Sequence, residues 1–213
     1  MYADAISDGL YAEFYEEHAD QARQEFRADR LRSYYAAHPS MAQVALTLLA
    51  GARALREASL AASLVRATTA SELGIKNLLL RPIVFGLVHN ESIAGVVTSP
   101  ALSHSGLDSY HDLLLAILND HAGVDLATYS RPNTPLRLWL ELKENQKVRN
   151  GVIHRGEEPT AVQRDLAIAV AETILDLLFP QVVGRLGFDL HGPLLCDESH
   201  VSEDVLRMLA RLD

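Results

Sequence analysis

Apolar residues recur at helical spacing along most of this chain, and the pattern is clearest in the segment that follows Pro159. There the apolar positions are mostly three or four residues apart: Leu166, Val170, Ile174, Leu177 and Leu178. Such spacing places them on one face of a helix. Thr160 and Gln163 form a capping box at its start. We therefore predict an amphipathic helix that runs from here to about Gly184 or Gly187.

Two long helices are predicted in the N-terminal half of the chain. The first, at 8–37, is acidic and ends before Pro39, because the residue that precedes a proline avoids helical geometry. The second, at 41–80, is rich in Ala and Leu. Ser40 caps it, with a Gln three residues later completing a capping box, and Pro82 breaks or kinks its end.

Shorter helices are predicted in the C-terminal half. One spans 108–123 after a loop at 89–107 that is rich in Gly, Ser and Pro. The next begins at Thr134, followed by a proline that suits the first helical position, and continues to the Gly-containing turn at 156–159. A final short helix is predicted at 202–212. No segment shows sustained strand-like alternation.

These elements predict an all-α fold, an up-and-down helical bundle with an extra N-terminal helix. We divide the 213 residues into an acidic helical extension at 1–38, a helical bundle at 39–190, and a loop with a short helix at 191–213.

Composition points to a cytoplasmic protein. No uninterrupted apolar stretch reaches the roughly 20 residues that span a bilayer, and no basic region precedes an apolar run at the N-terminus. Cys196 is the only cysteine, which fits a reducing compartment. His191 and His200 lie near it in sequence, but we interpret this region as a connecting loop rather than a nucleophilic site.

The charge is unevenly distributed. A net charge of −9 argues against a broad, non-specific nucleic-acid binder. Residues 131–164 nevertheless hold seven Lys and Arg against four Glu, so this region suits a small anionic target.

The chemically most informative stretch lies within that region and reads Arg-Asn-Gly-Val-Ile-His from Arg149 to His154. A guanidinium stabilises negative charge on phosphorus, and an imidazole moves protons near neutral pH. On a straight helix, positions five apart point about 140° from each other. Either the helix loosens at Gly151 or a second subunit supplies the matching group across a two-fold axis.

A structural interpretation of the same residues stands beside the catalytic one. Arg149 falls next to an apolar stripe, where a cation must be paired. It can pair with Glu72 and so tie two helices together, while His154 stabilises the end of its helix.

Two other groups of residues have side chains that could bind a metal ion or nucleic-acid bases. A two-His, one-carboxylate metal site would be formed by His104, Asp108 and His111. Nucleic-acid bases could stack on the aromatic rings of Tyr34, Tyr35 and Trp139. We interpret the first group as a loop with a helix cap and the second as packing residues, so no metal and no cofactor is predicted.

The motif from Arg149 to His154 resembles the signature of the HEPN superfamily (higher eukaryotes and prokaryotes nucleotide-binding). The segment 70–79, in which Glu72 and Lys76 are four residues apart, is similar to the family's first core helix, and an apolar helix follows the motif as in the family. The resemblance covers about 41–183 at the level of helix order.

The resemblance implies a homodimeric, metal-independent endoribonuclease. Arg149 and His154 would be the catalytic pair, with Asn150 as a supporting polar group and Glu72 orienting the arginine. Substrate RNA would be bound by Lys147, Arg155 and Lys76. Attack of the RNA 2′-hydroxyl would leave 2′,3′-cyclic phosphate and 5′-hydroxyl ends.

Family membership would also fit a toxin or antiviral defence effector, with an antitoxin or other regulatory protein as a partner. The alternative is a catalytically silent HEPN-like module that binds a nucleotide or a protein, which the acidic net charge favours.

Overall fold

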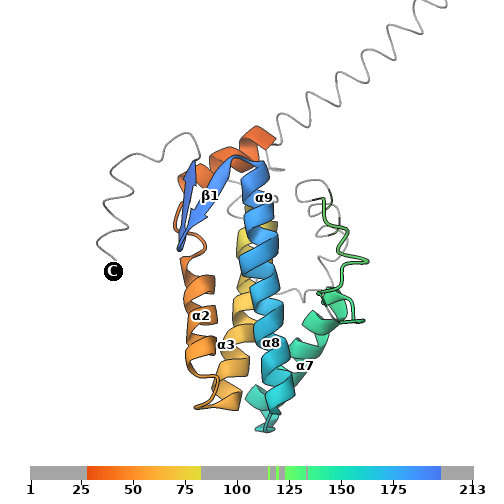
Figure 1. Cartoon of the computed structure of the whole chain (residues 1–213). Coiled ribbons are helices and arrows are strands. Elements are labelled where there is room, and N and C mark those ends of the chain that lie inside the picture. The colour runs from red at the N-terminus through yellow and green to blue at the C-terminus, as the bar shows by residue number, and fades with distance from the viewer. Residues whose placement is uncertain (1–27, 83–114, 116–118, 120–122, 133, 198–213) are drawn as a thin grey trace, which may run out of the picture.

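The computed structural model describes residues 28–82, 115, 119, 123–132 and 134–197, and these are mostly helical (Figure 1). The named helices are α2 (Gln43–Ala54), α3 (Leu60–Leu73), α7 (Leu138–Arg155), α8 (Ala161–Glu172) and α9 (Phe179–Arg185). Two π-helical stretches are η1 (Gly74–Leu80) and η3 (Thr173–Leu178). The strands β1 (Phe188–His191) and β2 (Leu194–Asp197) form a small sheet. The predicted helical class is confirmed.

The helices pack side by side (Figure 1). Helix α3 contacts α2, α7 and α8, and α8 also contacts α2 and α7. The predicted apolar helix is continuous through α8, η3 and α9, over Ala161–Arg185. Its capping box is confirmed, since Thr160 accepts a hydrogen bond from the backbone of Gln163 and the Gln163 side chain accepts one in return.

Among the described helices, Ala161–Arg185 alone is long and apolar enough to cross a bilayer by length and composition. Of its most apolar window, 61% is buried inside the protein. Packing against neighbouring helices therefore accounts for much of this apolar character.

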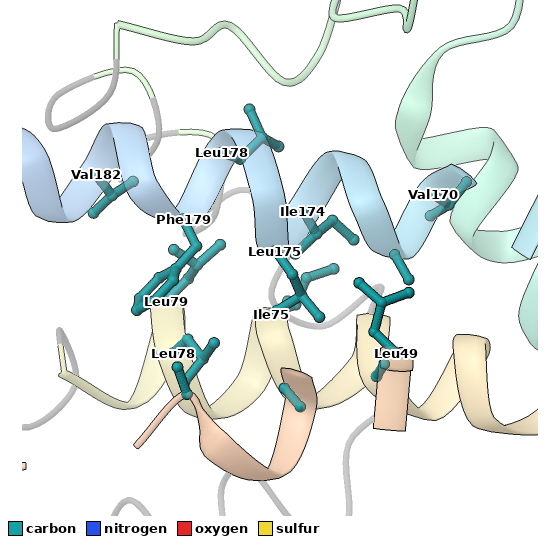
Figure 2. Close-up of a cluster of buried hydrophobic side chains, with 14 of the residues drawn as sticks. Leu49, Ile75, Leu78, Leu79, Val170, Ile174, Leu175, Leu178, Phe179 and Val182 are labelled. Carbon is teal, nitrogen blue, oxygen red and sulfur yellow. The ribbon is translucent and has the colours of Figure 1, made fainter. Parts of the chain in front are cut away.

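The hydrophobic core extends between the helices, and one part of it lies where η1 and η3 contact each other (Figure 2). Gly74, at the start of η1, makes this close approach possible. A β-carbon at Gly74 would lie 2.9 Å from Cγ2 of Ile174 and from Cδ2 of Leu175, inside normal contact distance.

The first predicted helix is described from residue 28 and ends at Ala37, as predicted. Its last turns belong to the core. Tyr35 is buried and donates a hydrogen bond from its hydroxyl to the carbonyl oxygen of Leu78 at 2.7 Å. The part of this helix predicted at 8–27 lies outside the described residues.

The prediction of one helix over 41–80 is wrong. Helix α2 ends at Ala54, and α3 starts at Leu60 with Ser59 as its cap. Ser40 does not cap α2; the residue at that position is Ala42, which makes no side-chain capping bond.

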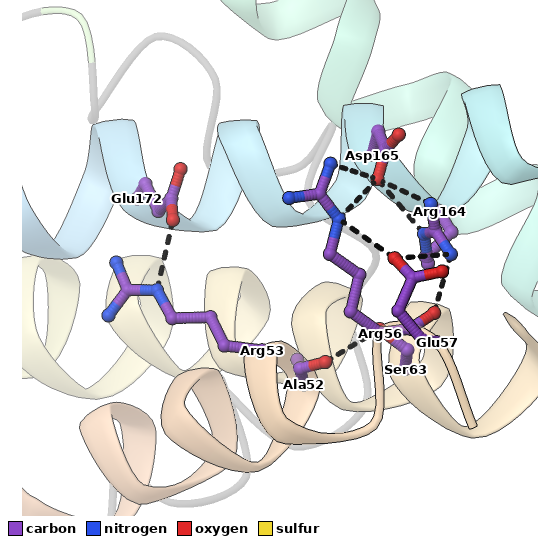
Figure 3. A network of polar contacts seen from close by, with 8 residues as sticks. All are labelled: Ala52, Arg53, Arg56, Glu57, Ser63, Arg164, Asp165 and Glu172. Carbon is purple, nitrogen blue, oxygen red and sulfur yellow. Dashed lines mark hydrogen bonds and ion pairs between the residues drawn. The ribbon is translucent and has the colours of Figure 1, made fainter. Parts of the chain in front are cut away.

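The break is stabilised by contacts distant in sequence (Figure 3). The buried Arg164 side chain of α8 donates to the carbonyl oxygen of Arg56 and to the Asp165 carboxylate. The Ser63 hydroxyl donates to the carbonyl of Ala52 at 2.7 Å. Backbone carbonyls left open by the end of α2 thus find partners that a local pattern cannot reveal.

The loop predicted from 191 onward begins instead with a hairpin. Strands β1 and β2 pair antiparallel, so the boundary expected between 190 and 191 falls inside β1. Gly192 in the turn has a φ of 57°, which glycine tolerates. The hairpin is held to the helices by a bond from Leu195 N to Pro39 O at 2.9 Å. The short helix predicted at 202–212 lies outside the described residues, as does most of 89–123.

Candidate functional site

The motif lies in the last turns of α7. The helix starts at Leu138 rather than at Thr134, whose hydroxyl instead accepts a bond from Leu136 N at 3.3 Å in the preceding turn. It ends at Arg155, and Gly156 follows with a φ of 67°, the left-handed conformation that closes many helices.

Helix α7 remains a regular α-helix through Gly151. Of the two explanations for the five-residue spacing, loosening of the helix is therefore wrong. Arg149 is half-buried, whereas His154 is exposed, as the angular separation of the two positions predicts. One copy of this helix does not bring the two side chains to one phosphate.

Arg149 is held by two acceptors. Its Nη2 donates to Oε2 of Glu72 in α3 at 3.0 Å, and its Nη1 donates to Oδ1 of Asn150 at 2.9 Å. The arginine side chain is 25% exposed and the glutamate 17%. The pairing of Arg149 with Glu72 predicted from the sequence is thus present, in a partly desolvated position where it is stronger than on the open surface.

The Arg149 guanidinium keeps further donors. Its Nε is buried and has no hydrogen-bond partner among the described residues. Each terminal nitrogen carries a second hydrogen for which the described part of the chain supplies no acceptor. Because the Arg149 side chain is 25% exposed, an anion from the solvent side would approach the terminal N–H groups and not the buried Nε.

The exposed face of α7 carries other candidates. Leu140, Lys147 and His154 are seven residues apart, so they share one stripe of the helix, and all three are exposed. Lys147 lies 3.8 Å from the carboxylate of Glu144, a loose surface pair. Within the described ranges no hydrogen-bond partner holds the His154 ring.

Arg155 is already paired. Its Nε lies 2.6 Å from Oε1 of Glu157, and the guanidinium holds the pKa of that carboxyl below its usual range. The carboxylate lies so close to Gly151 that a β-carbon there would collide with it. Glu157 thus engages Nε and Nη2 of Arg155.

Lys147 and Arg155 also flank a cavity of about 210 Å³ between α7 and the start of α8. Apolar walls are provided by Val148, Val152 and Pro159. Lys76 lies one turn after Glu72 in η1 and is half-buried. The structure therefore brings together Glu72, Arg149 and Asn150, whereas Lys147, His154 and Arg155 lie on other sides of α7.

Gln146 is the residue that sequence reasoning missed. Its Nε2 donates to Oε1 of Glu72 at 3.2 Å, so the two oxygens of one carboxylate serve two residues of α7. Its position three residues before Arg149 places both on one side of the helix, but that spacing alone does not select Glu72 as its partner.

The remaining candidates have structural surroundings. Cys196 is buried in β2, and burial together with the Asp189 carboxylate raises the pKa of its thiol, which makes it a poor nucleophile. Tyr34, Tyr35 and Trp139 are buried, as expected for packing residues. The described residues contain no group of three or more potential metal ligands, and His104, Asp108 and His111 lie outside them.

Comparison with protein-family models, with curated proteins and with solved structures finds no match to this chain.

Proposed function

We propose that this protein is a metal-independent endoribonuclease of HEPN type, acting as a homodimer in the cytoplasm. The observation that carries the proposal is how the Arg149 side chain is hydrogen-bonded. Its guanidinium is oriented by Glu72 and Asn150 and still has N–H donors to offer, on the helix that also exposes His154. The mostly helical structure is consistent with this assignment, since short connections at 55–59 and 156–160 join helices that contact each other.

The chemistry follows from the residue types. The 2′-hydroxyl of RNA attacks the adjacent phosphorus, and His154 takes its proton as a general base. Arg149 donates hydrogen bonds to the phosphoryl oxygens and stabilises the charge of the phosphorane. The bond from phosphorus to the 5′-oxygen breaks, and that oxygen takes up a proton from water, leaving 2′,3′-cyclic phosphate and 5′-hydroxyl ends.

The regularity of α7 supports the proposed homodimer. Because Arg149 and His154 of one copy point to different sides, we pair Arg149 of one protomer with His154 of the second across a two-fold axis. Leu140, which is 51% exposed on the stripe of His154, and Ile153, which is 49% exposed and four residues after Arg149, are proposed to supply apolar surface on the two sides of α7 that meet the second protomer. Lys147, Arg155 and Lys76 are proposed to bind the flanking RNA.

In the cell, this activity would suit a toxin or antiviral effector that an antitoxin or regulatory protein restrains. That part of the proposal rests on the family resemblance alone.

A second candidate is a catalytically silent module that binds a nucleotide or a protein. The ion pair between Arg149 and Glu72 favours it, because a guanidinium engaged by a carboxylate is partly neutralised before any phosphate arrives. The net charge of −9 points the same way.

RNA cleavage in the presence of EDTA decides between the two. We expect the wild-type chain to cleave RNA, Arg149→Ala and His154→Ala to lose the activity, and DNA to resist because it lacks the nucleophile. Val44→Ser, which changes an exposed residue of α2, serves as the matched control and should cleave normally. Cleavage that persists in both variants, or that stops in EDTA, contradicts the mechanism, and a wild-type chain that binds RNA without cutting it favours the silent module.

A further inference from the structure

The Glu72 carboxylate accepts hydrogen bonds from two residues of α7. Oε2 accepts from Nη2 of Arg149 at 3.0 Å, and Oε1 accepts from Nε2 of Gln146 at 3.2 Å. A carboxylate and a guanidinium left to themselves favour a two-bond contact, in which both oxygens meet two N–H groups of the arginine. Here a single guanidinium nitrogen bonds the carboxylate, and Nε2 of Gln146 bonds its second oxygen.

The number of bonds between Arg149 and Glu72 determines how many N–H donors of Arg149 remain for another acceptor. Arg149 uses one hydrogen for Glu72 and one for Asn150, while Nε is buried. A second bond to Glu72 from a terminal nitrogen would engage another of the four terminal N–H groups and turn the guanidinium further toward the carboxylate. A phosphate would then compete with Glu72 for the same donors.

We propose that Gln146 is a positioning residue for Arg149. By holding Oε1 of Glu72, it limits the ion pair to one bond and keeps the guanidinium free to bind a phosphate. The role in RNA binding rests on the proposed function; the role in orienting Arg149 does not.

Gln146→Met tests the idea, because methionine has a similar length and donates no hydrogen bond. We expect the dissociation constant for an RNA oligonucleotide made uncleavable by 2′-deoxy substitution to rise about tenfold, the effect of losing roughly one charge-assisted bond. The thermal midpoint should stay within about 2 °C of wild type, since the ion pair is retained and tightened. Gln146→Lys, which still offers a donor to Oε1, should restore most of the binding.

Nitrogen-15 NMR of the Arg149 guanidinium provides a readout that needs no RNA, with Arg149→Lys to assign the signal. Gln146→Met should shift the terminal-nitrogen signals, and Gln146→Lys should shift them less. Unchanged Arg149 signals in Gln146→Met, or a large drop in its thermal midpoint with unchanged RNA affinity, would overturn the inference. If the signals shift while the wild-type chain neither binds nor cleaves RNA, the proposed function fails and the positioning role stands.

Discussion

The carboxylate of Glu72 in α3 lies 3.0 Å from Nη2 of Arg149 in α7, and the two side chains are only 17% and 25% exposed. The contact joins two helices through residues that are 77 positions apart in sequence. It gives a partly buried cation its counter-ion and fixes the direction in which the guanidinium points. The stability of the fold and the proposed chemistry of Arg149 therefore depend on the same pair.

We expect Glu72→Ala to lower the free energy of unfolding by about 1–2 kcal/mol, less than for a fully buried pair, because solvent reaches both groups. Arg149→Ala should have a comparable effect. In the double variant the two losses should overlap, with a coupling of about 1 kcal/mol in urea denaturation. Losses that simply add would show that the contact contributes nothing to the folded state.

Gly74 sets the distance between η1 and η3. Gly74→Ala would press a methyl group against Ile174 and Leu175 at 2.9 Å, so we expect a loss of about 1–3 kcal/mol in the free energy of unfolding. Gly184→Ala is the matched control, because nothing lies within 4 Å of a β-carbon there. That change should stabilise α9 by about 0.5 kcal/mol. Thermal denaturation measures both, and equal effects would rule out the packing role of Gly74.

Local signals predicted the elements that depend on neighbouring residues. The capping box of Thr160 and Gln163 and the turn at Gly156 are both present as predicted, because each is built within a few residues. The break before Ser59 was missed, since residues 55–58 have ordinary helical propensity and the contacts from Arg164 come from another helix. The β1–β2 hairpin was missed because its strands have four residues each, too short for a clear alternation.

In the candidate site, too, some contacts could be predicted from the sequence and others depend on how distant helices pack. The pairing of Arg149 with Glu72 followed from the need to compensate a charge beside an apolar stripe, and the separation of His154 from Arg149 followed from helix geometry. The bond from Gln146 to Glu72 could not be predicted from the sequence, because a glutamine on a helix has many equivalent partners. Only the packing of α3 against α7 selects one of them.

The polar contacts around the α2–α3 turn predict a pH dependence (Figure 3). Hydrogen bonding from Arg164, then its charge and that of Arg56, lower the pKa of Asp165 from its ordinary value of 3.8. A carboxyl whose pKa is lower in the folded state stabilises the fold above the unfolded-state value, and this contribution is lost as the pH falls through the folded-state value.

Asp165→Asn should therefore flatten the loss of thermal stability between about pH 5 and pH 3. The control is Asp189→Asn, which changes an exposed carboxylate of β1 without an ion pair in the described part of the chain. Thermal midpoints recorded across this range measure the effect. If wild type and Asp165→Asn lose stability in parallel on acidification, Asp165 is not the group responsible.

The pairing of Arg149 with His154 across two protomers can be tested by mixing inactive variants. In a dimer of Arg149→Ala with His154→Ala, one site lacks both groups and the other keeps the intact arginine of one chain and the intact histidine of the other. If subunits exchange at random, half of the dimers are mixed and half of their sites are complete, so about a quarter of wild-type RNA cleavage should return. The separate variants should stay inactive at the same total concentration, and a covalently linked pair of one variant with itself should remain inactive too. No recovery from a mixture shown to contain mixed dimers would mean that each chain supplies both groups of its own site, which the regular course of α7 through Gly151 disfavours.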